Sequence, residues 1–106
     1  MKIWVDDVRP APPGYVWARS VDGAKDLIIV YSEHIDFDNN VVDAVELIDI
    51  DHDAGNYVKR GGDYIKLLEW LEETGRNYPI RIHSTDTVGV ENMRSIIQRN
   101  RWKEIF

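Results

Sequence analysis

The chain has 106 residues, of which 43% are hydrophobic and 30% are charged, and its formal net charge is -6 at pH 7. The length suits one compact domain over residues 1–106, and the negative charge argues against non-specific binding to duplex DNA. The absence of cysteine excludes disulfides, thiolate metal sites and thiol catalysis, and no apolar run approaches the about 20 residues that span a bilayer, so we expect a cytoplasmic protein without a membrane segment.

Five segments have the apolar composition of strands in a parallel sheet. They are residues 2–5, 15–18, 44–50 and 80–82, with a short edge strand over residues 102–106. The first two are separated by a rigid loop over residues 9–14, because its three prolines prevent a strand or a helix from continuing. Residues 35–40 are polar and turn-forming, and they lead into the third strand.

Three further segments place apolar residues on one helical face. Their candidate N-caps are Ser20, Asp63, and either Asp86 or Thr87. The predicted inward-facing residues are Val21, Ala24, Ile28 and Tyr31 in the first helix, Tyr64, Leu67, Leu68 and Leu71 in the second, and Val90, Met93 and Ile97 in the third. Strands that alternate with helices predict right-handed crossovers and a parallel sheet covered on both faces, which is a three-layer α/β fold.

Acidic side chains follow two of these strands. Asp6 and Asp7 come after the first, and Asp51 and Asp53 after the third. Ligands bind beyond the carboxyl ends of parallel strands, so we expect the four carboxylates to lie close together. Like charges raise one another's pKa unless a cation neutralises them, and oxygen ligands suit Mg²⁺ or Mn²⁺. We predict a metal site of these four residues; the alternative is a set of acids that cap turns and helix N-termini.

Two histidines, His52 and His83, lie near the same edge. Because histidine titrates near neutral pH, such a pair can take a proton from water and deliver one to a leaving oxygen. His52 could instead pack under a loop, and either histidine could bind a metal. Ser84 and Thr85 follow His83 as hydroxyl donors to phosphate oxygens.

Three cations are candidate substrate-binding residues. Lys59 and Arg60 precede a Gly-Gly pair and a helix start, where backbone N–H groups can hold an anion. The spacing of a Walker P-loop is absent, and a solvated surface loop is the alternative interpretation. Arg9, close to Asp7, is either a phosphate ligand or a salt-bridge partner of the acidic pair.

The order of these residues resembles that in the receiver domains of response regulators. Asp6-Asp7, Asp51 and Ser84 occupy the positions of the acidic pair, the phosphorylated Asp and the Ser or Thr of those domains. The Lys that follows the fifth strand in receivers, and the room for a full last helix, are missing. A phosphorelay receiver therefore fits poorly, and the fold that this resemblance implies is a receiver-like, flavodoxin-like sheet truncated at the C-terminus.

Six short motifs carry a closer resemblance. They are Asp6-Asp7-Val8-Arg9-Pro10, Asp51-His52-Asp53-Ala54-Gly55, Gly62-Asp63-Tyr64, His83-Ser84, Gly89 and Asn92-Met93. Together they resemble the family of cyclic-phosphate processing receiver domains, over almost the whole chain. The chain departs from the family at Ala54, where Leu is usual, at Asp63, which is inserted, and at Asp86, where Asn is usual.

The function predicted from these residues is metal-assisted hydrolysis of a cyclic phosphate on a nucleotide or RNA end. Mg²⁺ or Mn²⁺ would stabilise charge on the phosphoryl oxygens. His52 and His83 would be general base and general acid, with Arg9 and Ser84 positioning the phosphate. In a variant of this mechanism, Asp51 is the nucleophile and passes through an aspartyl phosphate.

Two other classes of function stay open. The first is a non-enzymatic signalling or interaction module that binds a metal or a phosphorylated partner. The second is an acidic protein that blocks a nucleic-acid-binding partner by charge mimicry. The partner expected for the enzyme is a small phosphorylated substrate or an RNA end, and the sequence predicts no particular oligomeric state.

Overall fold

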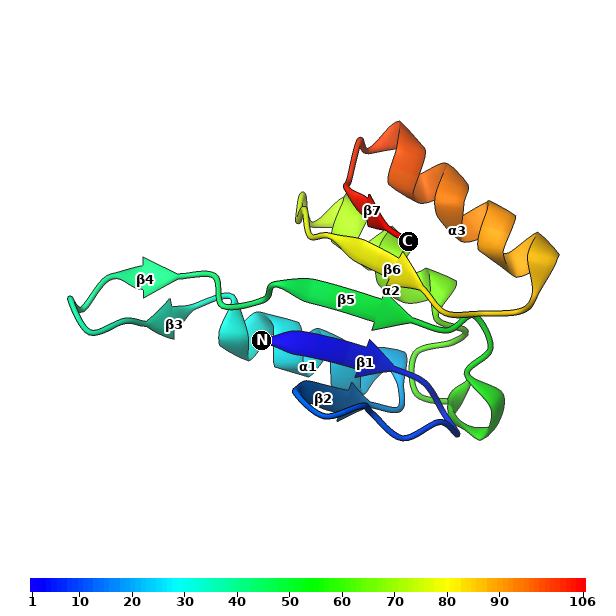
Figure 1. The fold of residues 1–106 in the computed structure, drawn as a ribbon, viewed down its shortest axis with the longest axis horizontal. Coiled ribbons are helices and arrows are strands. Elements are labelled where there is room, and N and C mark those ends of the chain that lie inside the picture. The colour runs from blue at the N-terminus through cyan, green and yellow to red at the C-terminus, as the bar shows by residue number, and fades with distance from the viewer.

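The computed structural model describes residues 1–106 and has a five-stranded parallel sheet at its centre (Figure 1). Its strands are β1 (Lys2–Val5), β2 (Tyr15–Ala18), β5 (Leu47–Ile50), β6 (Ile80–Ile82) and β7 (Glu104–Ile105). Their order is β2-β1-β5-β6-β7. The chain runs outward from β1 to β2 and then returns across β1 to β5, so the strand order reverses between β1 and β5. This switch point is where ligands bind in open parallel sheets.

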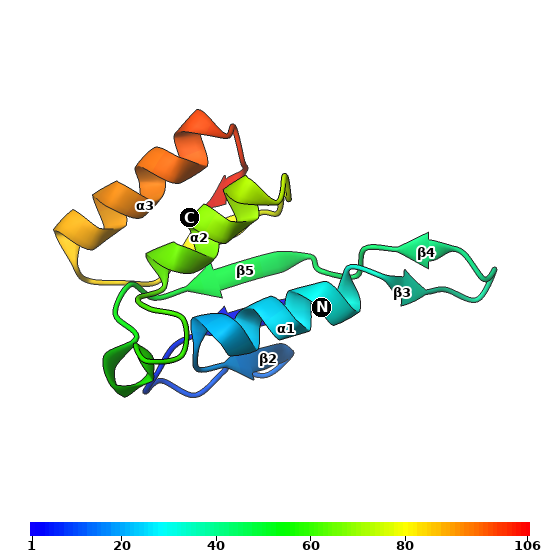
Figure 2. The same cartoon turned by 180° about the vertical axis from the view of Figure 1, so that it is seen from behind.

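Three helices pack on the sheet: α1 (Val21–Tyr31), α2 (Ile65–Glu73) and α3 (Thr87–Arg99), and a single 3-10 turn, η1 (Gly55–Tyr57), follows β5. They lie on one face, because α1 and α2 are behind the sheet in Figure 1 and in front of it in Figure 2, and α2 packs between α1 and α3. None of the helices is both long and apolar enough to cross a membrane.

The predicted receiver-like α/β sheet is confirmed, but the expected third layer is not. A helix on the other face would belong to the crossover between β1 and β2. That connection is the proline-rich loop over residues 6–14, which contains no helix. The sheet therefore has a helix-covered face and a helix-free face.

Alternation along the strands gives the two faces different side chains. Ile3 of β1 and Ile48 of β5 are paired in register, and both are fully buried in the core with the apolar stripes of the helices. The next residues along the register, Trp4 and Asp49, point to the helix-free face, where Asp49 is paired with Arg81 of β6. The helix-free face thus carries the polar residues of the sheet interior.

Two of the predicted helix caps are confirmed and one is wrong. Ser20 and Asp86 each accept a hydrogen bond from the N–H of the third residue of the helix that follows. Asp63 does not cap α2, which begins without a side-chain cap. Its Oδ1 instead accepts from the backbone N–H of Ala54 at 3.2 Å, so it ties the loop after β5 to the start of α2.

Residues 34–42 form a two-stranded antiparallel hairpin, β3 (His34–Ile35) and β4 (Val41–Val42), which projects from the body (Figure 2). We call it the β3–β4 arm. The polar turn predicted over residues 35–40 joins its strands, but the strand predicted over 44–50 begins only at Leu47. The backbone N–H of Ala44 bonds to the carbonyl of Tyr31 at 2.8 Å, which closes the base of the arm.

Candidate functional site

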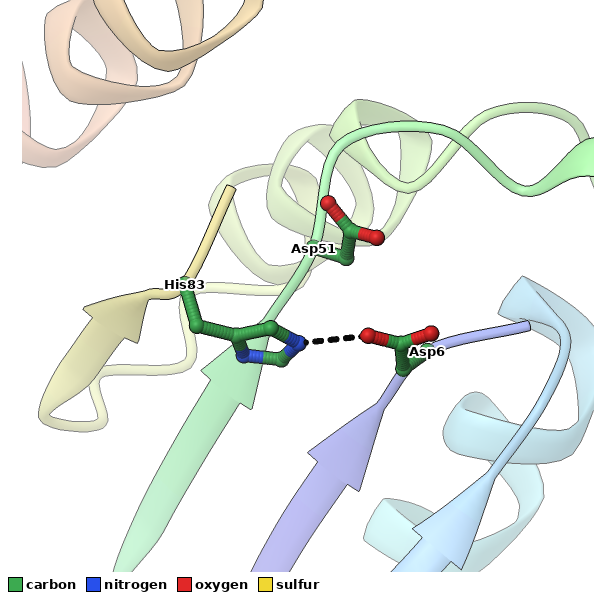
Figure 3. Close-up of side chains that lie close together, drawn as sticks. All are labelled: Asp6, Asp51 and His83. Carbon is green, nitrogen blue, oxygen red and sulfur yellow. Dashed lines mark hydrogen bonds and ion pairs between the residues drawn. The ribbon is translucent and has the colours of Figure 1, made fainter. Parts of the chain in front are cut away.

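The carboxyl ends of β1, β5 and β6 bring three side chains together. Asp6 follows β1, Asp51 follows β5 and His83 follows β6. One ligand atom from each lies within 4.8 Å of the others, and Figure 3 shows His83 and Asp6 pointing toward each other with Asp51 beside them. We call these three residues the strand-end cluster. Its position spans the switch point between β1 and β5.

Asp6 is fixed in place by hydrogen bonds to both of its carboxylate oxygens. Oδ1 accepts from the backbone N–H groups of Val8 at 2.9 Å and Arg9 at 2.8 Å, and Oδ2 lies 2.9 Å from Nε2 of His83. Burial alone would raise the pKa of Asp6, but these hydrogen bonds outweigh it and lower the pKa below its usual value. Asp6 is therefore a carboxylate at neutral pH.

His83 is held from both sides in the helix-free face of the sheet. Its side chain is only 6% exposed, and its ring is stacked on Trp4 with 3.8 Å between the ring centroids. Nδ1 lies 2.6 Å from Oδ1 of Asp49, whose other oxygen accepts from Nη1 of Arg81 at 3.0 Å. Arg81, Asp49, His83 and Asp6 thus form a continuous polar chain that leads into the cluster.

Asp49 is a site-supporting residue that the sequence analysis did not single out. It is fully buried inside β5. The sequence contained an indication of this role. Strand residues two apart share a face, and a charged residue in a buried strand needs a partner. Asp49 and Asp51 have this spacing, as do Arg81 and His83, and an acid facing an arginine predicts the pair seen here.

Asp7 and Asp53 lie at the rim of the cluster. Burial, followed by the charges of Asp6, Asp51 and Asp53, raises the pKa of Asp7. Oδ1 of Asp53 accepts from the backbone N–H of Gly55 at 2.8 Å. Gly55 has φ +53°, and a Cβ there would lie 2.2 Å from Oδ2 of Asp7, so only glycine lets the two loops come this close. The four predicted acids therefore share one edge, with Asp6 and Asp51 at its centre.

His52 is directed away from the strand-end cluster. Its Nδ1 lies 3.3 Å from Oδ2 of Asp86, without the geometry of a hydrogen bond. A Cβ added to Gly89 would meet its ring at 2.4 Å, so the ring packs directly on the first turn of α3. The alternative to general base was that His52 packs under a loop; its ring does pack, but against the helix α3.

The predicted phosphate-positioning residues sit around the end of β6. Nη1 of Arg9, which is exposed, lies 3.4 Å from the carbonyl oxygen of His83. Ser84 accepts a hydrogen bond from the backbone N–H of Asp86 through its Oγ at 3.2 Å. Ser84 and Thr85 line a shallow cavity of about 230 Å³ together with residues of α3. Arg9 is the predicted cation nearest to the cluster.

Lys59 and Arg60 lie in the loop between η1 and α2. The backbone N–H groups of Arg60 and Gly62 bond to the carbonyls of Tyr57 and Val58, so they do not form the free anion cradle that the Gly-Gly pair predicted. The carbonyl of Arg60 accepts from the N–H of Asp22 at the start of α1. Both cationic side chains are exposed, as in the alternative interpretation of a solvated loop.

Trp17 in β2 and Arg19 just after it hold the backbone of the acidic pair, and Tyr64 just before α2 holds Arg19; none was predicted to do so. Nε1 of Trp17 donates to the carbonyl of Asp6 at 2.7 Å, and Nη2 of Arg19 donates to that of Asp7 at 3.1 Å. The hydroxyl of Tyr64 in turn donates to the carbonyl of Arg19 at 2.7 Å. Burial, reinforced by the nearby acids, raises the pKa of Tyr64, so its hydroxyl stays a donor.

The donor set of the cluster fits a divalent cation. The two carboxylates suit Mg²⁺ or Mn²⁺, and the neighbouring acids that help to raise the pKa of Asp7 carry the charge that a cation would neutralise. Oδ1 of Asp51 accepts from the N–H of His52 at 2.7 Å, which leaves its second oxygen for a ligand. Nε2 of His83 can serve either Asp6 or a metal but not both, because it needs an N–H to donate to the Asp6 carboxylate and a lone pair to bind a metal.

A parallel sheet of this strand order, with acids after β1 and β5, defines a receiver-like α/β domain. The model of the family described as cyclic-phosphate processing receiver domain matches residues 1–99. The chain belongs to this family, as its motifs predicted. Comparisons with curated proteins and with solved structures gave no match.

Proposed function

We propose that this domain is a metal-dependent phosphoesterase that opens a cyclic phosphate on a nucleotide or RNA end. The observation that carries the proposal is the convergence of Asp6, Asp51 and His83 within 4.8 Å at the switch point of the sheet. The family match links such domains to the processing of cyclic phosphates. A hard cation and a phosphate ester are the ligands that this combination of charge and position favours.

Asp6 and Asp51, with His83 beside them, would hold Mg²⁺ or Mn²⁺, which supplies Lewis-acid stabilisation of the phosphoryl oxygens when bound. Hydrolysis joins a water oxygen to phosphorus, breaks one ring P–O bond and leaves a proton on the departing oxygen. Arg9, exposed beside the cluster, would bind and orient the phosphate. Asp51, partly exposed with one oxygen free of protein donors, would orient the water or attack phosphorus itself.

The placement of His83 supports a positioning role for this residue. Carboxylates flank both of its ring nitrogens, and its ring is stacked on Trp4. We therefore propose that His83 is a positioning residue, which holds the Asp6 carboxylate in place for the metal, and that the more exposed Asp51 faces the substrate.

One observation favours a second candidate, a non-enzymatic module that binds a metal or a phosphorylated partner. Neither histidine offers a free ring nitrogen to the cluster, because His83 is held by Asp6 and Asp49, and His52 packs against α3. A site without a free histidine can bind phosphate and still lack a general acid.

Phosphorus NMR with a 2′,3′-cyclic nucleotide separates the two candidates. With Mg²⁺ or Mn²⁺ present, the proposal expects loss of the cyclic resonance, an arrest by chelator, and a rate at least about 100-fold lower for Asp51→Asn. The matched control is Asp26→Asn on the exposed side of α1, which should leave the rate unchanged. Metal-dependent broadening of the ligand signal without turnover would instead favour the binding module.

A further inference from the structure

The β3–β4 arm is the most solvent-exposed part of the chain. It extends away from the sheet along the longest dimension of the molecule, which measures 44 Å against 28 and 24 Å in the other directions (Figure 1). Its two strands pair only with each other, so each keeps one free edge. An isolated two-stranded hairpin is marginal in water, and such edges invite further contacts.

The arm exposes apolar side chains along its length. Ile35 and Val41 face each other across the hairpin and are 52% and 66% exposed, and Phe37 in the turn is completely exposed. A shallow hollow of about 340 Å³ follows β3 and is lined by His34, Ile35, Asp36 and Phe37. Clustered exposed apolar side chains on a folded domain mark an interaction site.

The fold of the body does not depend on these side chains. No residue of the arm belongs to the hydrophobic core. The base is closed independently, by the N–H of Ala44 on the carbonyl of Tyr31 and by the hydroxyl of Tyr78, which donates to Asp43 at 2.6 Å. The apolar residues of the arm therefore have no partner in the hydrophobic core of the body.

The side chains of the arm carry negative charge and no Lys or Arg, and the cations nearest to it, the Met1 ammonium and Arg76, lie at its base. The sequence contains no Lys or Arg between Lys25 and Lys59. Acids surround the apolar residues, at Glu33 and Asp43 near the base and at Asp36 and Asp38 near the tip. A second copy of the arm would place acid against acid, and anionic lipid would be repelled, whereas a basic surface would be attracted.

We propose that the β3–β4 arm docks on a partner protein that offers an apolar pocket bordered by Lys and Arg side chains. Phe37 is the anchor that enters the pocket, because a large exposed aromatic residue gains most from burial. Asp38 meets the cations at the rim. The proposal is independent of the phosphoesterase activity, since the arm and the strand-end cluster occupy different ends of the sheet (Figure 2).

The first test uses photo-crosslinking in a lysate of the cells from which the chain comes. A photoreactive phenylalanine analogue replaces Phe37, and mass spectrometry identifies the cross-linked peptide. The matched control carries the analogue in place of Phe106, an exposed aromatic residue that lies beside Arg94. Unlabelled wild-type protein should compete, and a variant with residues 34–42 replaced by Gly-Gly should not.

The result expected is a cross-link from the position of Phe37 to one protein, on an apolar surface rich in Lys and Arg. Cross-links to a second copy of this chain, to a surface without Lys or Arg, to the same proteins as the Phe106 control, or to nothing would each overturn the proposal. So would flotation of the wild-type protein, but not the arm-excised variant, with vesicles of phosphatidylcholine and phosphatidylglycerol.

The second test measures affinity for the purified partner. Phe37→Ser should weaken binding about tenfold or more, as loss of a central anchor does. Asp38→Lys should weaken it about threefold and reduce its dependence on salt. Asp38 suits this test because its side chain, unlike that of Asp36, accepts no hydrogen bond within the turn. Equal affinities for wild type and both variants would overturn the proposal, and Phe106→Ser is the control.

Discussion

The buried side chains on the two faces of the sheet are covered by different kinds of groups, apolar helix residues on one face and hydrogen-bonded polar residues on the other. On the helix-covered face, Ile3 and Ile50 are enclosed by the apolar stripes of three helices. On the helix-free face, Asp49 is just as buried, but it is enclosed by the Arg81 guanidinium and the His83 ring to which it is hydrogen-bonded. Apolar burial depends on filled volume, whereas polar burial depends on every partner being present. The face that supports the site is therefore sensitive to single hydrogen bonds.

The largest effect should come from a cavity on the helix-covered face. Leu68 of α2 is fully buried in the core, so Leu68→Ala should lower the free energy of unfolding by about 3 kcal/mol. Urea denaturation followed by circular dichroism measures the loss. Glu73→Ala at the exposed end of the same helix serves as control, and a loss below about 1 kcal/mol for Leu68→Ala would show that the helices can close over the gap.

A smaller loss should follow when one partner is removed from the helix-free face. Asp49→Asn keeps the shape of the side chain but removes the charge shared by Arg81 and His83, and it should lower the free energy of unfolding by about 2 kcal/mol. The ring resonances of His83 in NMR should shift as well. Asp26→Asn controls for removal of an exposed acid, and an unshifted His83 would contradict the hydrogen bond to Asp49.

Asp6 should shape the stability of the metal-free protein in acid. Its pKa is lowered in the folded state, so the stability that it contributes is fully present above its ordinary value of 3.8 and is lost as the pH falls through the lower folded value. Thermal melts below pH 4 should therefore drop more steeply for wild type than for Asp6→Asn. Parallel acid limbs for the two proteins would show that the hydrogen bonds of Asp6 do not favour its ionised form.

The smallest effect, of opposite sign, is expected for Asp7. Its pKa is raised in the folded state, so its ionisation at neutral pH opposes folding while no cation is bound. Asp7→Asn should raise the melting temperature of the metal-free protein slightly at pH 7, and lose this advantage below the ordinary pKa of 3.8. Added Mn²⁺ should stabilise wild type more than the variant; equal stabilisation would remove Asp7 from the metal site.

Most strands and helices could be predicted because buried apolar residues recur along the sequence with the period of the element that buries them. The strands and helix stripes alternate with periods that the sequence displays, and parallel strand ends necessarily share an edge, which brought Asp6, Asp51 and His83 together. The order of the short motifs identified the family. Ser20 and Asp86 were visible as caps because side-chain capping is a local interaction.

The remaining features depend on longer-range geometry. His52 lies just past the end of β5, where strand alternation no longer fixes the direction of a side chain. The β3–β4 arm has strands of two residues, too short for a periodic signal. Coverage of both sheet faces was expected from alternation of strands and helices, but the loop between β1 and β2 breaks that alternation once, and one missing crossover leaves a whole face without helices.

The contact between His52 and Gly89 packs the loop after β5 tightly against the first turn of α3. The imidazole ring occupies the space that a Cβ at position 89 would need, so neither part can advance toward the other. Any side chain at position 89 would therefore have to displace either the ring of His52, with the loop after β5, or the start of α3.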